Sequence, residues 1–485
     1  MTVKRALLID GRDVPARSGR TTEDRGPCTG EVYALVAAAD AEDVRAAVGA
    51  AHAAFPRWAA TPPSARRALL MSAADLLESR LAEFSNIMLN ETGGTRAWAR
   101  VNVKVTADQM RQAATAATAP AGHLPATDRT GQWSLAVREP AGVVAAIVPW
   151  NAPLILCART IMVALAVGDT VVLRPSEDAP ITSGLFLADV LRDAGLPDGA
   201  LNVVTNDRDD APAVIEALIA DPRVRRVAFT GSTAVGRIVG RLAGEHLKPA
   251  ALELGGKNPI IVCEDADLDH AVSAIAYAKF QNSGQVCLAV DRIILNRAIA
   301  GEFTTRFVEK AASLRQGDPA DPDTVIGPLI NERAVERIAA LVDDAVGKGA
   351  RTLLGGGADG RNYPVTVLDG LTPEMRVYHE ETFGPVASLY TVADDDAAVA
   401  LANDTDYGLT SAVFTRDTAR ALSIARRLRH GSAHVNAHTI QEEPQAPIGG
   451  IKDSGFGAFG GPQEIDFFTE ARWITLAEQS EPLPF

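Results

Sequence analysis

Short apolar runs and helical patterns alternate along most of the chain beyond Gly142. The apolar runs predict buried strands, at Val143–Val148, Thr170–Leu173, Leu201–Val204 and Val227–Phe229. The helical patterns lie between or after these strands, at Leu154–Ala166, Ile181–Ala194, Ala211–Ala220 and Thr233–Ala243. This alternation predicts a parallel, doubly wound sheet, in which a ligand binds beyond the carboxyl ends of the strands.

A second α/β region is predicted from about Asn258 to Val435. Its candidate strands are Pro259–Val262, Asp291–Leu295, Ala387–Thr391 and Ser411–Phe414. Near the start of the chain, the pattern predicts one helix over Asp40–Trp58, with Asp40 as its N-cap. Another helix is expected to start near Ser64 and to end at the glycine pair Gly93-Gly94. The fold class is therefore α/β.

The net charge of the chain indicates which classes of binding partner are expected. The 485 residues include 47 Lys and Arg against 61 Asp and Glu, a net charge of −14. Nucleic acids and anionic membranes usually require a positive patch, so neither is expected as a partner. We interpret the cluster Arg223, Arg225 and Arg226 as a solvated turn before a strand. No apolar run has the length of a signal-peptide core or a membrane span, which favours a cytoplasmic protein.

The four cysteines differ in their surroundings. They form no CxxC pair and no Cys/His cluster, so neither a metal site nor a disulfide framework is predicted. Cys157 and Cys263 lie in apolar runs, which indicates buried packing, and Cys28 lies in a segment typical of a surface loop. Cys287 follows a loop that contains Gly284, where a thiol can face a cleft. Cys287 is the best-placed candidate nucleophile, although spacing alone does not assign it.

Two further residues carry side chains suited to acyl chemistry. Asn151 follows an apolar strand, where its amide can donate to an oxyanion without titrating; a turn former or helix cap would have the same pattern. Glu253 is flanked by apolar sequence, which should raise its pKa and suit it as a general base. The alternative for Glu253 is a salt bridge with Lys257.

Three segments are suited to a dinucleotide. Glu177, in the segment Arg174–Glu177, follows a strand and can accept hydrogen bonds from a ribose diol, although a solvated turn is the alternative. The segment Phe229–Ser232 leads into a helix whose free N–H groups attract phosphate, and Gly231 permits close approach. GxGxxG is absent. Another carboxylate, that of Glu381, lies in the segment Glu381–Pro385, and the aromatic ring of Phe383 follows it two residues later.

Taken together and in this order, these motifs resemble the aldehyde dehydrogenase superfamily, and the resemblance covers essentially the whole chain, including Asn436 and the glycine-rich run 449–461. The resemblance implies that Cys287 attacks an aldehyde to form a thiohemiacetal, whose oxyanion is held by Asn151 and the Cys287 N–H. Hydride transfer to NAD then leaves a thioester, and Glu253 activates the water that hydrolyses it; in some members it also helps to deprotonate the thiol.

The resemblance also implies a set of cofactor contacts. It places Trp150 and Ser232 near the pyrophosphate, Glu177 on the adenosine ribose, Glu381 on the nicotinamide ribose and Phe383 beside the nicotinamide. The full set is Trp150, Arg174, Ser176, Glu177, Gly231, Ser232, Leu254, Gly255, Glu381 and Phe383. Glu177 would repel the extra phosphate of NADP, so NAD should be preferred. The family usually has Lys where this chain has Arg174, a swap that could relax this choice.

The implied fold has three parts. They are a Rossmann-like NAD-binding domain over residues 1–120 and 141–254, an α/β catalytic domain over 255–448, and a small β bridging element over 121–140 and 449–485. The bridging element would pair a hairpin near Gly131–Pro140 with a strand around Trp473–Leu476. Because such an arm leaves a sheet edge for another subunit, a homodimer or homotetramer is expected.

Within the superfamily, the segment Pro149–Leu156 and the tail 460–473 look like benzaldehyde, vanillin and salicylaldehyde dehydrogenases. Ala152 would leave room for a ring, Trp98 could stack on an aromatic substrate, and Arg159 could meet a ring hydroxyl or methoxy group. Alternatively, Trp98 is core packing and Arg159 forms an internal salt bridge. The polar loop 437–446 is expected to border the substrate entrance, where its carboxylates would disfavour strongly anionic aldehydes.

Three other functions compete with oxidation of an aromatic aldehyde. The nearest is the same chemistry on an aliphatic aldehyde or a semialdehyde, for which Arg159 could bind the distal carboxylate. Ester hydrolysis without a cofactor is a second alternative, but the cofactor-type residues would then have no purpose. A non-catalytic protein on the same fold is a third, against which both Cys287 and Glu253 are present.

Overall fold

An eight-stranded sheet forms the larger half of the protein, whose computed structural model describes residues 2–478. The central strands β8 to β12 run parallel, and β2, β3 and β20 add antiparallel edges. The order across the sheet is β20 (Gly455–Phe456), β12 (Ala250–Glu253), β11 (Val224–Thr230), β8 (Val143–Ile147), β9 (Thr170–Arg174), β10 (Leu201–Val203), β2 (Leu7–Ile9) and β3 (Arg12–Val14). The chain runs outward from β8 to β10 and returns to β11 on the other side of β8, so the order reverses between β8 and β11.

Helices cover this sheet, and those predicted from the sequence are present. They are α1 (Ala41–Ala59), α2 (Pro63–Ser79), α3 (Leu81–Glu91), α4 (Arg96–Ala116), α5 (Pro153–Val167), α6 (Phe186–Asp193), α7 (Ala211–Ala220) and α8 (Thr233–Glu245). The single helix expected from Ser64 to the glycine pair is wrong, because it breaks at Arg80 (φ −96°, ψ 16°). The apolar spacing continues across this one-residue break and therefore does not reveal it. A π-helical turn, Ile181–Leu185, precedes α6.

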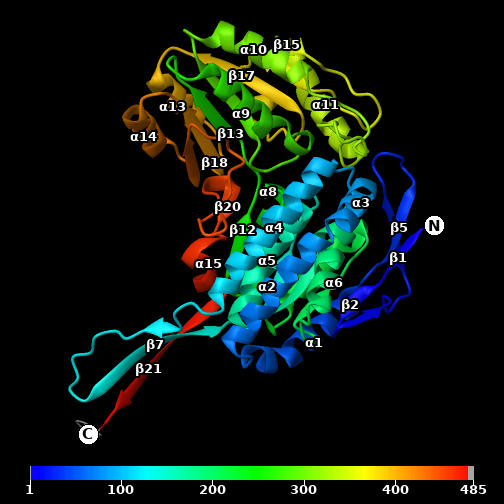
Figure 1. The fold of residues 1–485 in the computed structure, drawn as a ribbon, viewed down its shortest axis with the longest axis vertical. Helices are drawn as coiled ribbons and strands as arrows, with labels where there is room; N and C mark the ends of the chain where they lie inside the picture. Colours follow the sequence, from blue (N-terminus) through cyan, green and yellow to red (C-terminus); the bar gives the residue numbers. More distant parts are fainter. Residues whose placement is uncertain (1, 479–485) are drawn as a thin grey trace.

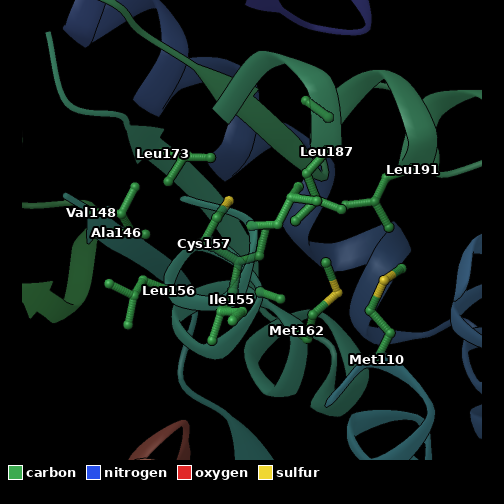
Figure 2. Close-up of a cluster of buried hydrophobic side chains, with 14 of the residues drawn as sticks. Met110, Ala146, Val148, Ile155, Leu156, Cys157, Met162, Leu173, Leu187 and Leu191 are labelled. Atoms are coloured by element: carbon green, nitrogen blue, oxygen red, sulfur yellow. The ribbon is translucent and has the colours of Figure 1, made fainter. Parts of the chain in front are cut away.

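Helix α5 is the centre of the core between the sheet and the outer helices (Figure 2). All its residues except Arg159 and Thr160 are apolar, as expected of a helix that is almost fully enclosed. In Figure 2 its side chains lie between the sheet residue Leu173 and Met110 of the outer helix α4, with Leu187 of α6 beside them. Cys157 is buried in this cluster, which confirms its predicted packing role. Pro153 begins α5 and Gly168, at φ 111°, ends it.

A seven-stranded sheet forms the second half, shown at the top of Figure 1. Its order is β15 (Arg351–Leu354), β16 (Thr366–Asp369), β17 (Val386–Val392), β14 (Val290–Asn296), β13 (Asn258–Val262), β18 (Thr410–Phe414) and β19 (Ser432–Val435). The four predicted strands are present, and β15, β16 and β19 were not predicted. The helices of this half are α9 (Leu268–Phe280), α10 (Ala300–Ala312), α11 (Glu332–Gly347), α12 (Arg376–His379), α13 (Asp395–Asn403) and α14 (Thr418–Arg427).

A two-stranded arm projects from the body (Figure 1). Strand β7 (Gln132–Pro140) pairs antiparallel with β21 (Thr469–Ala477) along its whole length, and β6 (Gly122–His123) pairs with β7. The arm carries exposed apolar side chains, among which Trp473 is 72% exposed. Helix α15 (Gly461–Phe467) leads into β21, and a separate small sheet near the N-terminus consists of β1 (Val3–Arg5), β5 (Val32–Ala37) and β4 (Thr21–Arg25).

The arginine cluster at the base of the arm differs from its sequence interpretation as a solvated turn. Arg225 and Arg226 lie inside β11 rather than in a solvated turn. Arg226 is buried, and its guanidinium donates to the carbonyls of Phe467 and Thr469. Hydrogen bonds from an arginine to backbone carbonyls so distant in the chain cannot be recognised from a local run of basic residues. Between Val3 and Glu478, no helix has the length and apolar character needed to cross a membrane.

Candidate active site

The candidate site lies where the ends of the two large sheets meet. The segments that leave β8, β11 and β12 at their carboxyl ends carry Asn151, Ser232 and Leu254. The segments that enter β14 and β17 carry Cys287 and Glu381. All five residues line one cavity. The β8 and β11 ends are also where the strand order reverses, the usual ligand position in a doubly wound sheet.

The segment before Cys287 has an unusual backbone. Asn282, Ser283 and Gly284 all have positive φ angles, of 49°, 57° and 73°. A Cβ on Gly284 would lie 2.2 Å from the carbonyl oxygen of Gly384, so only glycine fits there. Non-glycine residues with positive φ cost free energy and persist only where their surroundings enforce them. The segment is thus held in a fixed conformation immediately before the thiol.

Cys287 lies beside the two other residues predicted to act with it. Its Sγ donates to Oε1 of Glu253 at 3.5 Å. The amide of Asn151 donates to the carbonyl of Gln285 at 3.1 Å, which leaves one amide hydrogen for another acceptor. The carbonyl of Asn151 accepts hydrogen bonds from Trp98 Nε1 at 3.0 Å and from the Asn282 amide at 2.9 Å. The structure therefore brings Cys287, Glu253 and Asn151 together.

Burial decides the resting protonation of this group. Desolvation raises the pKa of the Glu253 carboxyl, and the nearby charge of Arg159 opposes that rise. Desolvation also raises the pKa of the Cys287 thiol well above its ordinary value, and the Glu253 carboxylate raises it further. The thiol is consequently neutral at rest, and Glu253 is the adjacent group that can accept its proton.

Two cavities open on either side of the thiol. The larger cavity, about 490 Å³, is lined by Pro149, Trp150, Asn151, Leu156, Thr230, Gly231, Ser232, Thr233, Ala234, Leu254, Gly255, Cys287, Arg337, Glu380, Glu381, Phe383 and Tyr407. The smaller cavity, about 130 Å³, is lined by Trp98, Val101, Val105, Asn151, Ala152, Ile155, Leu156, Arg159, Tyr277, Val286, Cys287, Leu288, Ile440 and Glu442. Asn151, Leu156 and Cys287 line both cavities. Two reactants, one bound in each cavity, can therefore both reach the thiol of Cys287.

Most of the predicted cofactor residues line the larger cavity. Ser232 is the N-cap of α8, so free N–H groups of that helix face the cavity, where they suit a phosphate. The carboxylate of Glu381 accepts from Gly256 N at 3.0 Å, and desolvation raises the pKa of this carboxyl to about 7. A Cβ on Gly255 would lie 2.5 Å from Glu381, which accounts for the glycine. Phe383 and Trp150 make an edge-to-face contact.

The segment Arg174–Glu177 does not line the larger cavity. Arg174 donates to Glu177 at 2.7 Å, and Arg208 pairs with the other oxygen of Glu177 at 2.9 Å. Although desolvation opposes them, these two cations lower the pKa of Glu177. Ser176 is buried beside them. Glu177 is therefore an ion-paired carboxylate rather than the exposed residue of a solvated turn.

The structure decides the alternative for Glu253 and gives the contacts of Arg159 and Trp98. Lys257 pairs with Asp291 at 2.9 Å, so the Glu253–Lys257 salt bridge is wrong. Arg159 forms the internal salt bridge considered as an alternative, at 2.6 Å to Glu442 and 3.6 Å to Glu253. It also lines the smaller cavity. Trp98 is likewise both buried and part of the cavity wall.

Three residues that shape the site were not singled out from the sequence. The amide of Asn258 donates to the carbonyl of Cys287 at 2.7 Å, and the Gln285 amide oxygen accepts from Ile330 N at 3.0 Å. Arg337 lines the larger cavity and donates to the carbonyls of Glu381 and Thr382. Gln285 lies two residues before Cys287, and Asn258 follows Lys257 directly, whereas Arg337 lies on α11 with no local signal.

Comparison with known proteins identifies the family of the chain. The model of the Aldehyde dehydrogenase family matches residues 14–474. The chain therefore belongs to the aldehyde dehydrogenase family and is an oxidoreductase.

Among its relatives, a vanillin dehydrogenase from Pseudomonas fluorescens is 49% identical over 470 residues, 97% of each chain. A benzaldehyde dehydrogenase (NAD+) from Pseudomonas putida is 41% identical over 460 residues, 95% of this chain and 94% of the relative. The crystal structure of a salicylaldehyde dehydrogenase from Pseudomonas putida G7, complexed with salicylaldehyde, superimposes with a TM-score of 0.98 at 40% identity and covers 100% of both chains.

Proposed function

We propose that this aldehyde dehydrogenase oxidises small aromatic aldehydes to carboxylic acids with NAD, through a covalent intermediate on Cys287. One observation carries the proposal: Cys287 lies at the junction of a larger and a smaller cavity, with Glu253 3.5 Å from its thiol. A covalent nucleophile needs an adjacent base and access to both reactants, and this position supplies both.

The reaction begins with proton transfer from the Cys287 thiol to Glu253. The thiolate attacks the aldehyde carbon and forms a thiohemiacetal, whose oxyanion accepts hydrogen bonds from the Asn151 amide and the Cys287 N–H. NAD, when bound, supplies the acceptor for the hydride that leaves this carbon, and the product on Cys287 is a thioester. Glu253 releases the thiol proton to solvent and then takes a proton from water as the water attacks the thioester. The products are the carboxylic acid and the free thiol.

NAD fits the residues of the larger cavity. The free N–H groups at the start of α8 and the close approach allowed by Gly231 suit a pyrophosphate. We assign Trp150, Gly231, Ser232, Leu254, Gly255, Glu381 and Phe383 to this cofactor. Glu177, with Arg174 and Ser176 beside it, is assigned to the adenosine ribose at the carboxyl end of β9. The benzaldehyde relative is named for NAD, which supports the same cofactor here.

The smaller cavity favours an aromatic substrate over the alternatives. At about 130 Å³ it is well below the roughly 300–1,000 Å³ of pockets for drug-sized ligands, so only a small aldehyde fits. Trp98 and a set of aliphatic side chains form its wall, which suits one ring. Among the described residues, Arg159 is the only cation that lines it, and Glu442 and Glu253 already pair with this arginine. A semialdehyde carboxylate would therefore lack a free cation.

Steady-state rates of NADH formation across an aldehyde panel test this substrate class. Benzaldehyde, vanillin and salicylaldehyde are compared with hexanal and succinic semialdehyde, with NAD and NADP in parallel. The proposal requires the highest kcat/KM for the aromatic aldehydes with NAD. Faster turnover of hexanal or succinic semialdehyde would discard the aromatic assignment. Ester hydrolysis without any NAD-linked oxidation would instead favour the hydrolase alternative.

We also propose the three-part division given above and assembly into a homo-oligomer through the arm. Trp473, Leu476 and Trp133 are large apolar side chains that stay exposed on β7 and β21, and exposed apolar sheet surface of this kind usually meets a partner. Light scattering on wild type and on Trp473→Glu tests the assembly. A wild-type monomer would contradict it. The cytoplasmic location stays a prediction.

A further inference from the structure

A cluster of buried charges lies behind the larger cavity and is not explained by the proposed reaction steps. Lys257, Lys279, Asp291 and Thr382 are each at most 3% exposed. Asp291 accepts from Lys257 Nζ at 2.9 Å and from Lys279 Nζ at 3.5 Å. The two cations hold the pKa of Asp291 at about 2 against the effect of desolvation. Buried charges carry a large desolvation cost, and well-packed apolar residues often stabilise a core at least as well.

The same carboxylate holds the segment that carries Glu381 and Phe383. Asp291 accepts from Thr382 N at 2.9 Å and from Thr382 Oγ1 at 2.6 Å. Lys257 Nζ also donates to the carbonyl of Glu380 at 2.7 Å. From the other side, Arg337 donates to the carbonyls of Glu381 and Thr382 at 3.0 and 2.7 Å. The polar backbone groups of segment 380–382 are thus anchored to buried charges.

This anchoring offsets a strained backbone. Phe383 has φ 45°, a left-handed backbone conformation that is unfavourable for a phenylalanine. Asp291 lies on β14, four residues beyond Cys287, and Lys257 lies immediately before the neighbouring strand β13. One carboxylate therefore connects three segments that line the larger cavity: the segment after Glu253, the nucleophile segment and segment 380–383.

We propose that Asp291 and Thr382 are positioning residues that fix Glu381 and Phe383, and through them the nicotinamide, at a set distance from Cys287. The inference rests on the proposed NAD-linked function. Hydride transfer depends steeply on alignment, and a displacement of about 1 Å can lower its rate about 100-fold. Ester hydrolysis by Cys287 needs the thiol, Glu253 and Asn151 but no nicotinamide. The two activities should consequently respond differently when segment 380–383 is released.

The test compares Thr382→Val, which removes the hydroxyl at nearly constant volume, with Thr382→Ser, which retains it. Asp291→Asn is a second variant that removes the charge. Thr170→Val serves as the matched control. Thr170 is as buried as Thr382, and its hydroxyl donates to Ala51 O at 3.0 Å. Thr170 is the first residue of β9, at the end of that strand away from Arg174 and Glu177. Melting temperatures verify that each variant is folded.

Four quantities are measured: kcat for aldehyde oxidation, the Kd of NAD from quenching of tryptophan fluorescence, the isotope effect with formyl-deuterated benzaldehyde, and ester hydrolysis without NAD. For Thr382→Val and Asp291→Asn we expect weaker NAD binding, kcat lowered about tenfold or more, and a larger isotope effect. Ester hydrolysis should stay within about twofold of wild type, and Thr382→Ser and Thr170→Val should behave as wild type.

A parallel loss of oxidation and ester hydrolysis in Thr382→Val would overturn the inference, because it would show general damage around Cys287. Unchanged NAD binding and isotope effects in both variants would also overturn it. Failure of the proposed function looks different, because the wild-type protein would then show no NAD-linked oxidation at all.

Discussion

The Sγ of Cys287 lies 3.5 Å from Oε1 of Glu253, and the thiol donates to the carboxylate. Desolvation raises the pKa of both groups, and the carboxylate raises that of the thiol further. A neutral thiol beside a carboxylate is a poor resting nucleophile but is ready to lose its proton locally. The base that later activates water is thus also placed to activate the thiol.

Replacing Glu253 by glutamine should disable both steps. The amide would keep the shape of the side chain but could not accept a proton, so kcat/KM for benzaldehyde should fall about 100- to 10,000-fold. The measurement is steady-state NADH formation. Glu442→Gln is the control, because Glu442 is the other carboxylate that pairs with Arg159. A variant that retained more than about a tenth of the wild-type kcat/KM would remove Glu253 from the mechanism.

Arg159 should set the acidic limb of the pH–rate profile. The activity requires the unprotonated Glu253, so kcat/KM rises with pH through the pKa of that carboxyl. Arg159, 3.6 Å from Glu253, favours the carboxylate and lowers this pKa. Arg159→Met should therefore raise it and move the acidic limb to higher pH by about one unit or more.

Arg159→Lys keeps a cation and serves as the control for that shift. Its acidic limb should stay closer to the wild-type position than that of Arg159→Met. A limb that moved to lower pH in Arg159→Met, or did not move at all, would show that Arg159 does not govern the ionisation of Glu253.

The sequence predicted what local patterns encode and missed what distant residues supply. The parallel strands, the helix start after Ser232 and the candidate nucleophile each depend on a short run of neighbouring residues. The pairs Arg159–Glu442, Lys257–Asp291 and Arg226–Thr469 join residues far apart in the chain. A single sequence carries no sign of such pairs, and for this reason it leaves open a Glu253–Lys257 salt bridge that the structure does not contain.

Trp98 should contribute to aromatic substrates more than to aliphatic ones. Trp98→Ala removes the ring and its hydrogen bond to Asn151 O, whereas Trp98→Phe removes only the hydrogen bond. Loss of ring stacking is worth about tenfold in kcat/KM for benzaldehyde, and hexanal should lose less in the same variant. Equal losses for the two aldehydes in Trp98→Ala would assign Trp98 to structure alone, and Trp98→Phe separates the contribution of the hydrogen bond.

Glu177 should determine the choice between NAD and NADP. It keeps Arg174 and Arg208 paired at 2.7 and 2.9 Å. Glu177→Gln would remove the repelling charge and leave two arginines to meet the extra phosphate, so kcat/KM with NADP should rise about tenfold or more. Glu177→Asp keeps the charge and is the control. Equal use of both cofactors by the wild-type protein would contradict this role.

The most direct test of the central claim is the rate of NADH formation from benzaldehyde in wild-type protein and in Cys287→Ala, with the fold of the variant verified by its melting temperature. The account predicts NAD-linked turnover by the wild type and a loss of at least about 1,000-fold in the variant, because no other described residue lies at the junction of the two cavities with a nucleophilic side chain beside Glu253. Turnover that survived in Cys287→Ala would contradict the mechanism.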